Sequence, residues 1–149
     1  MNRVELTRHE IREKALQSLY PFDFNQDITK EDAISYAFEY NNAEFVSEDG
    51  ESFIPGYLDT LVTGVCQQRE ELDQLIQKNL KKWTLARIAK PDLIILRIAI
   101  YEMLYVDEIP AKVALNEALE LTKKYSDDDS RKFVNGVLSN IVPTLNSEK

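Results

Sequence analysis

Three side chains near the C-terminus combine charge with an aromatic ring. Asp129, Lys132 and Phe133 are spaced i, i+3 and i+4, so they share one surface if this segment is helical. A lysine can contact a phosphate, and an aromatic ring at the edge of an apolar stripe can stack on a base, as single-stranded RNA recognition requires. Periodicity alone favours a plainer interpretation, in which Phe133 joins the core and Lys132 is solvated.

Groups that could perform catalysis are sparse in this sequence. His9 is the only histidine, Cys66 lies in a helical pattern with no obvious base, and there is no glycine-rich phosphate loop. The adjacent acids 127–129 could suggest a metal, but helix capping and the helix dipole explain three carboxylates at a helix start. We therefore expect no catalytic residue, no metal ion and no cofactor.

The segment 93–104 is the most apolar in the chain and reads LIILRIAIYEML. A surface helix shows a single apolar stripe, whereas this segment is apolar on most sides, so it predicts a central helix wrapped by others. Pro91 suits the first turn of that helix, since its missing N–H would have no partner there. Four side chains should be almost fully buried: Ile95, Leu96, Ala99 and Met103.

Other helices are predicted on both sides of the central one. Thr7 with Glu10 fits a capping box and starts a helix near Arg8 that should run to about Tyr20. A second start is indicated at Thr29. Apolar residues then keep helical register from about 54 to 80, which predicts one long helix.

Two further helices are expected after Pro110 and after the acids 127–129. Asn135 and Gly136 would suggest a hairpin turn between strands, but they lie inside a helical apolar stripe, so a helix is predicted. Gly64 within the long helical pattern costs about 1 kcal/mol relative to alanine, which suggests a close helix crossing.

The length of 149 residues fits one ordinary domain that can bury a real core. The net charge of −8 argues against a protein that coats nucleic acid through bulk electrostatics. Charge is also unevenly distributed: residues 23–59 contain one basic residue, Lys30, among many acids, whereas residues 78–90 contain five basic residues and no acid. A solvated helix face explains the acidic segment, whereas it explains the basic segment less well.

Cellular location is indicated by what the sequence lacks. The single Cys66 excludes an internal disulfide, and there is no secretory leader and no apolar run of membrane-spanning length. We expect a cytoplasmic protein that does not associate with membranes.

Four motifs in order carry a resemblance to a known family. They are RxxALQSLY at 12–20, DLIILRIAIYEM at 92–103, IPAKVALNEALELTKKY at 109–125 and DDSRKFVNGVL at 128–138. Together they closely resemble the bacterial NusB family. The resemblance covers essentially the whole chain, with little match at 22–54.

The resemblance implies an all-α fold of about seven helices. It would be a single NusB-like domain, residues 1–149, with an N-terminal helical subdomain of about 1–80 and a C-terminal one of about 83–149. It also implies a transcription antitermination factor that binds the boxA element of ribosomal RNA leader transcripts together with the small-subunit ribosomal protein NusE. That assembly would act on RNA polymerase with other Nus factors.

Site residues also follow from the resemblance. The RNA-binding positions would be Arg3, Arg8, His9, Arg12, Asp129, Lys132 and Phe133. The partner-binding positions would be Tyr20, Asp92 and Glu102. For Arg12 an alternative stays open, in which its aliphatic stem lies along neighbouring helices and its charge pairs with an acid.

Two other functions remain as alternatives. NusB-like domains precede catalytic domains in some RNA cytosine methyltransferases, so the chain could be an accessory domain of such an enzyme, although no cofactor-binding half follows it. The net acidity also permits a purely protein-binding helical adaptor.

Overall fold

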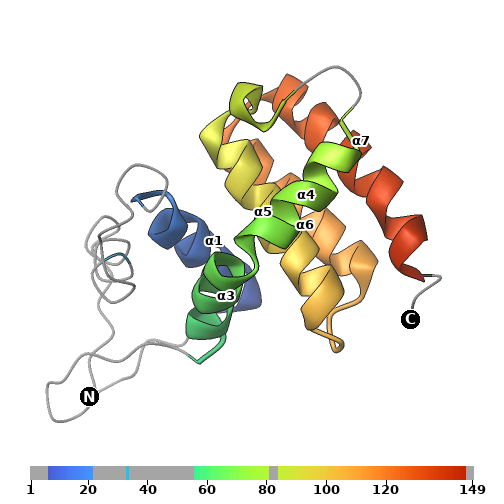
Figure 1. The fold of residues 1–149 in the computed structure, drawn as a ribbon. Helices are drawn as coiled ribbons and strands as arrows, with labels where there is room; N and C mark the ends of the chain where they lie inside the picture. The colour runs from blue at the N-terminus through green and yellow to red at the C-terminus, as the bar shows by residue number, and fades with distance from the viewer. Residues whose placement is uncertain (1–6, 22–32, 34–55, 81–83, 147–149) are drawn as a thin grey trace, which may run out of the picture. The chain divides into compact units, whose positions relative to one another are not determined.

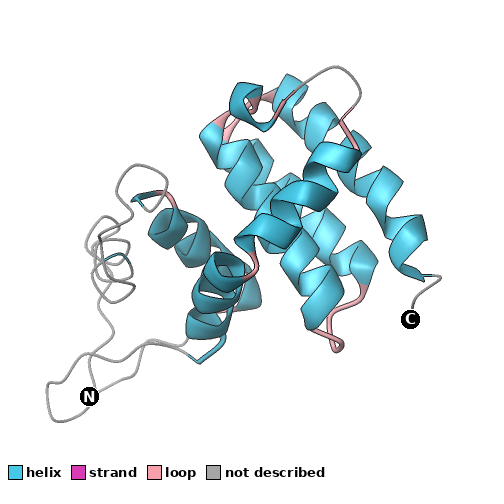
Figure 2. Cartoon of the chain, viewed as in Figure 1, coloured by secondary structure: helices cyan, strands magenta, loops and turns pink. Residues whose placement is uncertain are grey.

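The computed structural model describes residues 7–21, 33, 56–80 and 84–146 (Figure 1). The helices in chain order are α1 (Arg8–Leu19), α3 (Gly56–Gln67), α4 (Arg69–Lys78), the short 3-10 helix η2 (Leu85–Arg87), α5 (Lys90–Tyr105), α6 (Ala111–Tyr125) and α7 (Asp128–Asn146). Figure 2 shows only helices and loops in this described part of the chain, so the predicted all-α class is confirmed. The predicted helix start at Thr29, most of the acidic segment and the residues 81–83 lie outside the described residues.

The chain separates into two compact units, Met1–Thr63 and Gly64–Lys149. The division falls inside α3, whereas the sequence suggested one near residues 80–83. Helix α4 belongs to the C-terminal unit because Leu72 and Ile76 are fully buried and α4 packs against α5. The C-terminal unit therefore contains α4 to α7.

Helix α1 begins as the capping box predicts. The Thr7 hydroxyl accepts a hydrogen bond of 3.1 Å from the backbone N–H of Glu10, and the Glu10 carboxylate accepts one of 3.0 Å from the N–H of Thr7. This reciprocal pair satisfies two backbone donors that the first helical turn leaves without partners. The buried apolar face consists of Ile11, Ala15, Leu16 and Leu19.

Helix α5 is the central element of the C-terminal unit and contacts α4, α6 and α7. All four side chains predicted to be buried are at most 2% exposed, which confirms the central-helix assignment. Pro91 lies in the first turn, as expected.

A charged residue lies within this apolar helix and is paired. Arg97, 5% exposed, donates from Nε to Oδ1 of Asp73 at 2.8 Å and from Nη2 to Oδ2 at 3.0 Å. A two-pronged contact of this kind offsets part of the cost of removing both charges from water. It also links α4 to α5.

The prediction of one uninterrupted helix from 54 to 80 is wrong at Gln68. There the backbone turns to φ −102° and ψ 11°, which separates α3 from α4. Helical hydrogen bonding nevertheless crosses the junction, from Gln68 N–H to the Gly64 carbonyl and from Leu72 N–H to the Gln68 carbonyl, each at 2.9 Å. The junction is therefore a kink, which apolar periodicity does not reveal.

Helices α6 and α7 follow the predicted starts. Pro110 occupies the cap position of α6, and the Asp127 carboxylate accepts a hydrogen bond of 2.8 Å from the N–H of Ser130 in the first turn of α7. Asn135 and Gly136 are helical, so the helix prediction for this pair is confirmed. No helix in the described residues is long and apolar enough to cross a bilayer.

Candidate nucleic-acid interface

The first turns of α7 carry the three C-terminal candidate residues. Asp129 and Lys132 are exposed, and Phe133 is half-buried. Phe133 is therefore not a fully buried core side chain, and part of its ring borders a cavity. The helix places charge and aromatic surface side by side, as the i, i+3, i+4 spacing predicts.

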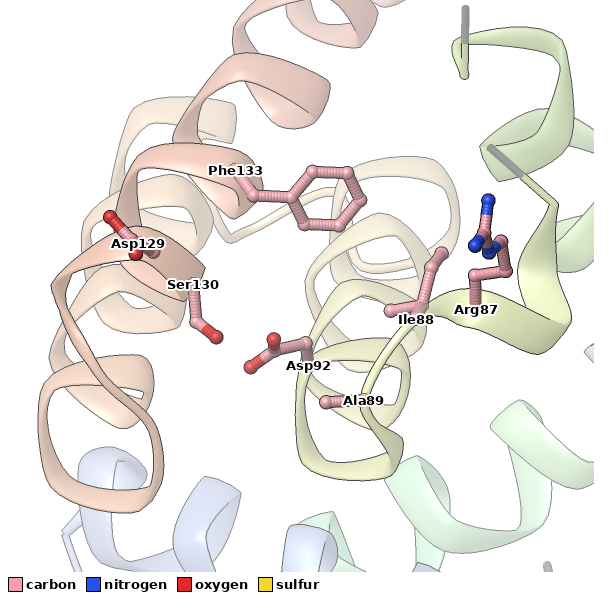
Figure 3. A pocket seen from close by; sticks show the side chains of 7 residues that line it. All are labelled: Arg87, Ile88, Ala89, Asp92, Asp129, Ser130 and Phe133. Carbon is pink, nitrogen blue, oxygen red and sulfur yellow. The ribbon is translucent and has the colours of Figure 1, made fainter. Parts of the chain in front are cut away.

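A cavity of about 350 Å³ lies within the C-terminal unit, beside these residues (Figure 3). Its walls come from the first turns of α7, the first turn of α5, and η2 with the link that follows it. The lining residues are Arg87, Ile88, Ala89, Asp92, Asp129, Ser130 and Phe133.

Asp92 is the least exposed charged group in the cavity wall, at 4%. Its Oδ1 accepts a hydrogen bond of 2.6 Å from the Ser126 hydroxyl, at the end of α6. In Figure 3 its carboxylate points toward Ser130. The predicted partner position thus lines this cavity, and its role in partner binding stays a prediction.

The other two predicted partner positions differ in accessibility. Tyr20 is 39% exposed at the C-terminal end of α1, whereas Glu102 in α5 is 1% exposed. Of the three predicted partner positions, only Tyr20 exposes a substantial part of its side chain. Because Glu102 is buried, it could affect partner binding only by supporting the residues packed around it.

The N-terminal basic candidates belong to the other unit. Arg8 is exposed, with its guanidinium carbon 3.6 Å from the centroid of the Tyr57 ring. His9 is half-buried, and Arg12 is only 2% exposed. This burial favours the alternative in which the Arg12 stem packs along neighbouring helices. Arg3 lies outside the described residues.

The cavity also contains residues that the sequence reasoning missed. Ile88, Ala89 and Ser130 were not candidates, and Arg87 was noted only as part of the basic segment. A signal existed for Arg87, because a run of five basic residues without an acid is unusual in such an acidic chain. Nothing in the local sequence pattern indicates that Ile88, Ala89 or Ser130 lines a cavity.

The chemistry available at this site comes from the side chains that line the cavity. The described residues contain no group of three or more His, Cys, Asp or Glu side chains that could hold a metal ion. The arrangement combines an aromatic ring, hydrogen-bonding groups and nearby cations, which suits binding of a polar, partly aromatic ligand.

Comparison with known proteins gives a consistent result. Residues 9–143 match the model of the NusB family. The transcription antitermination protein NusB of Enterococcus faecalis is 62% identical over 149 residues, which cover 99% of this chain and 97% of the relative. That of Lactiplantibacillus plantarum is 51% identical, over 93% of this chain and 96% of the relative.

Solved structures agree with these sequence relatives. T. maritima NusB superposes with a TM-score of 0.78 at 28% identity, covering 94% of this chain and 93% of that one. A crystal structure of antitermination factors NusB and NusE in complex with dsRNA gives a TM-score of 0.75 at 26% identity, covering 93% and 99%.

Proposed function

This chain belongs to the NusB family, and from that membership we propose that it is an RNA-binding transcription antitermination factor. It recognises the boxA element of ribosomal RNA leader transcripts together with the ribosomal protein NusE. The observation that carries this proposal is the full-length match to relatives named transcription antitermination protein NusB. The likeness to a NusB structure solved with NusE and RNA supports it.

The RNA lies against the first turns of α7. Lys132 is exposed and supplies a charge for a phosphate, while the half-buried Phe133 offers a ring on which a base can stack. Asp129 is exposed on the same turns of α7. Its negative charge repels phosphates and so restricts the path of the RNA backbone.

The basic residues of α1 provide a second group of RNA contacts. Arg8 is the strongest of them because it is exposed, and His9 is next to it. Arg3, which lies outside the described residues, is a further proposed contact. Arg12 contributes mainly to packing, given its burial.

NusE binds through a surface that includes Tyr20, with Asp92 and Glu102 as further predicted positions whose burial makes their contribution indirect. The assembled factor works with other Nus proteins on RNA polymerase and suppresses premature termination. It binds and does not catalyse, and it acts in the cytoplasm.

Binding measurements with and without NusE test this function. A boxA RNA and a scrambled RNA of equal composition are titrated with the protein, first alone and then with NusE present. We expect boxA to bind more tightly in both cases, and most tightly with NusE. Equal binding of the two RNAs would favour a methyltransferase accessory domain, and NusE binding without any RNA binding would favour a protein adaptor.

A further inference from the structure

We propose that Tyr57 is a positioning residue for RNA binding, whose ring holds the guanidinium of Arg8 in the orientation in which it meets a phosphate of the RNA. This inference rests on the proposed RNA-binding function, because that function gives Arg8 a phosphate to contact. It adds a residue at the start of α3 to the residues of α1 that the family resemblance assigns to RNA.

The contact between the two side chains is a stack of two flat groups. The guanidinium carbon of Arg8 lies 3.6 Å from the centroid of the Tyr57 ring. Carbon atoms in van der Waals contact are separated by about 3.5 to 4.0 Å, so the guanidinium lies against the face of the ring. Arginine stacks on aromatic faces in this way because its charged group is planar, whereas the ammonium of lysine is compact and not flat.

The stack fixes the direction in which Arg8 donates hydrogen bonds. The N–H groups of a guanidinium point outward in its own plane, so a contact through its face directs this fork past the edge of the ring. A phosphate can accept two of these hydrogen bonds in parallel. Arg8 is exposed and Tyr57 is half-buried, so the ring forms a base for a charged group at the surface.

The stack also leaves the positive charge of Arg8 in place. The ring attracts the cation through its quadrupole and adds no negative charge, so this contact does not compete with a phosphate. Arg8 is the first residue of α1, and Tyr57 is the second residue of α3. A cation is unfavourable at the positive end of a helix dipole, so its position does not stabilise α1, whereas it adds to the attraction of an anion there.

Holding Arg8 in advance should strengthen RNA binding. Immobilising one long, flexible side chain in an interface weakens binding by about 2- to 10-fold. An arginine that already stacks on a ring has lost much of this freedom before the RNA arrives. Tyr57 therefore raises the affinity without contacting the RNA itself.

Tyr57→Leu removes the ring, and Tyr57→Phe is the conservative variant that keeps it. Binding of a boxA RNA is measured without NusE over a range of salt concentrations. Tyr57→Leu should weaken binding about 2- to 10-fold without changing the slope of log affinity against log salt, because Arg8 still reaches the phosphate. Tyr57→Phe should bind RNA like the parent protein, because the stack needs the ring and not the hydroxyl.

Combining Tyr57→Leu with Arg8→Ala separates positioning from direct contact. Arg8→Ala alone should flatten the salt slope by about 0.7, the loss of one phosphate contact. In the Arg8→Ala protein, Tyr57→Leu should cause no further loss of affinity, since no guanidinium remains to be positioned. A further loss as large as that in the parent protein would show that Tyr57 contacts RNA or acts through the fold, and would overturn the inference.

Tyr105→Leu is the matched control, because it removes the ring of an exposed tyrosine that packs beside Tyr101, at 5.1 Å between centroids. It should leave RNA affinity unchanged. If Tyr57→Leu does not fold, a ring-fluorinated phenylalanine at position 57 decides instead. Fluorine withdraws electrons from the face of the ring and so weakens its attraction for a cation. This protein should bind RNA less tightly than Tyr57→Phe, and equal affinities would overturn the inference.

The remaining outcomes distinguish failure of this inference from failure of the proposed function. Unchanged affinity in a folded Tyr57→Leu protein would overturn the inference and leave RNA binding intact. Tighter binding by Tyr57→Leu would show that the ring keeps Arg8 away from RNA, and would also overturn it. Absence of specific boxA binding by the parent protein would refute the proposed function itself, and the inference with it.

Discussion

Gly64 of α3 lies directly against the phenol ring of Tyr101 in α5. A Cβ atom added at Gly64 would overlap with the Cζ, Oη and Cε1 atoms of that ring. The ring is also held on another side, since its centroid lies 5.1 Å from that of Tyr105. The sequence predicted a close helix crossing at Gly64, and the structure shows that this glycine leaves the space that the Tyr101 ring of α5 needs.

Replacing Gly64 and Gly136 with alanine should have opposite effects on stability. Gly64→Ala should lower the free energy of unfolding by about 1 to 3 kcal/mol, because the new methyl group overpacks the crossing. Gly136 is exposed within α7 with no atom within 4 Å of an added Cβ, so Gly136→Ala should raise stability by up to about 1 kcal/mol. Urea denaturation measures both, and a Gly64→Ala protein as stable as the parent would contradict the crossing.

Leu96→Ala should destabilise the protein by about 2 to 5 kcal/mol, because Leu96 is completely buried in the central helix and its truncation leaves a cavity. Val113→Ala is the control, since Val113 is 41% exposed and should change stability by no more than about 0.5 kcal/mol. Denaturation curves of the two variants and the parent provide the measurement. Equal curves for Leu96→Ala and the parent would show that α5 is not the core element.

The capping box of α1 should make stability depend on acidity. The hydrogen bond from the Thr7 backbone N–H holds the pKa of Glu10 below its ordinary value, and the Thr7 side chain acts in the same direction. The carboxylate therefore stabilises the folded state above its ordinary pKa, and this contribution disappears as the pH falls through the lowered pKa.

Glu10→Gln, which keeps a hydrogen-bond acceptor without a titrating charge, tests this dependence. The parent should be the more stable protein at neutral pH, and the difference should shrink to nothing in acid. The effect will be small because Glu10 is solvent-exposed. Thermal melts of both proteins across this pH range provide the measurement. If the difference in melting temperature stays constant with pH, titration of Glu10 is not its cause.

NusE and RNA should raise each other's affinity by the same factor, as linkage requires of two ligands on one protein. Tyr20→Ala should weaken NusE binding first, because Tyr20 is exposed on α1. Titrations of each ligand in the presence and absence of the other give both factors. An equal loss of RNA affinity in Tyr20→Ala without NusE would place Tyr20 in the RNA surface.

Features governed by local chemistry could be predicted from the sequence. The start of α1 follows from Thr7 and Glu10, and the burial of α5 follows from its apolar residues. The grouping of Asp129, Lys132 and Phe133 likewise depends only on helical spacing. In each case the determining residues lie within a few positions of one another.

Features that depend on packing between distant segments could not be predicted. The cavity exists because Arg87, Ile88, Ala89 and Asp92 meet the first turns of α7, about forty residues later in the chain. The burial of Asp92 and its bond to Ser126 have the same origin. The kink at Gln68 was also missed, since apolar residues keep helical register on both sides of it.

Salt dependence tests most directly whether the first turns of α7 hold RNA. Losing one phosphate contact should flatten the slope of log affinity against log salt by about 0.7 for single-stranded RNA. Losing one stacking platform should cost about 1 to 3 kcal/mol at every salt concentration. Lys132→Ala should therefore flatten the line, and Phe133→Ala should lower it without changing its slope.

Lys112→Ala is the matched control for this measurement, because Lys112 is exposed in the first turn of α6, which does not contribute to the cavity. It should leave the slope and affinity close to those of the parent. If the first turns of α7 hold RNA, we expect a flatter line for Lys132→Ala and a parallel, lower line for the folded Phe133→Ala protein. An unchanged slope and affinity in Lys132→Ala, or unfolding of the Phe133→Ala protein, would contradict RNA binding here, since this face of α7 would then be core and solvated surface only.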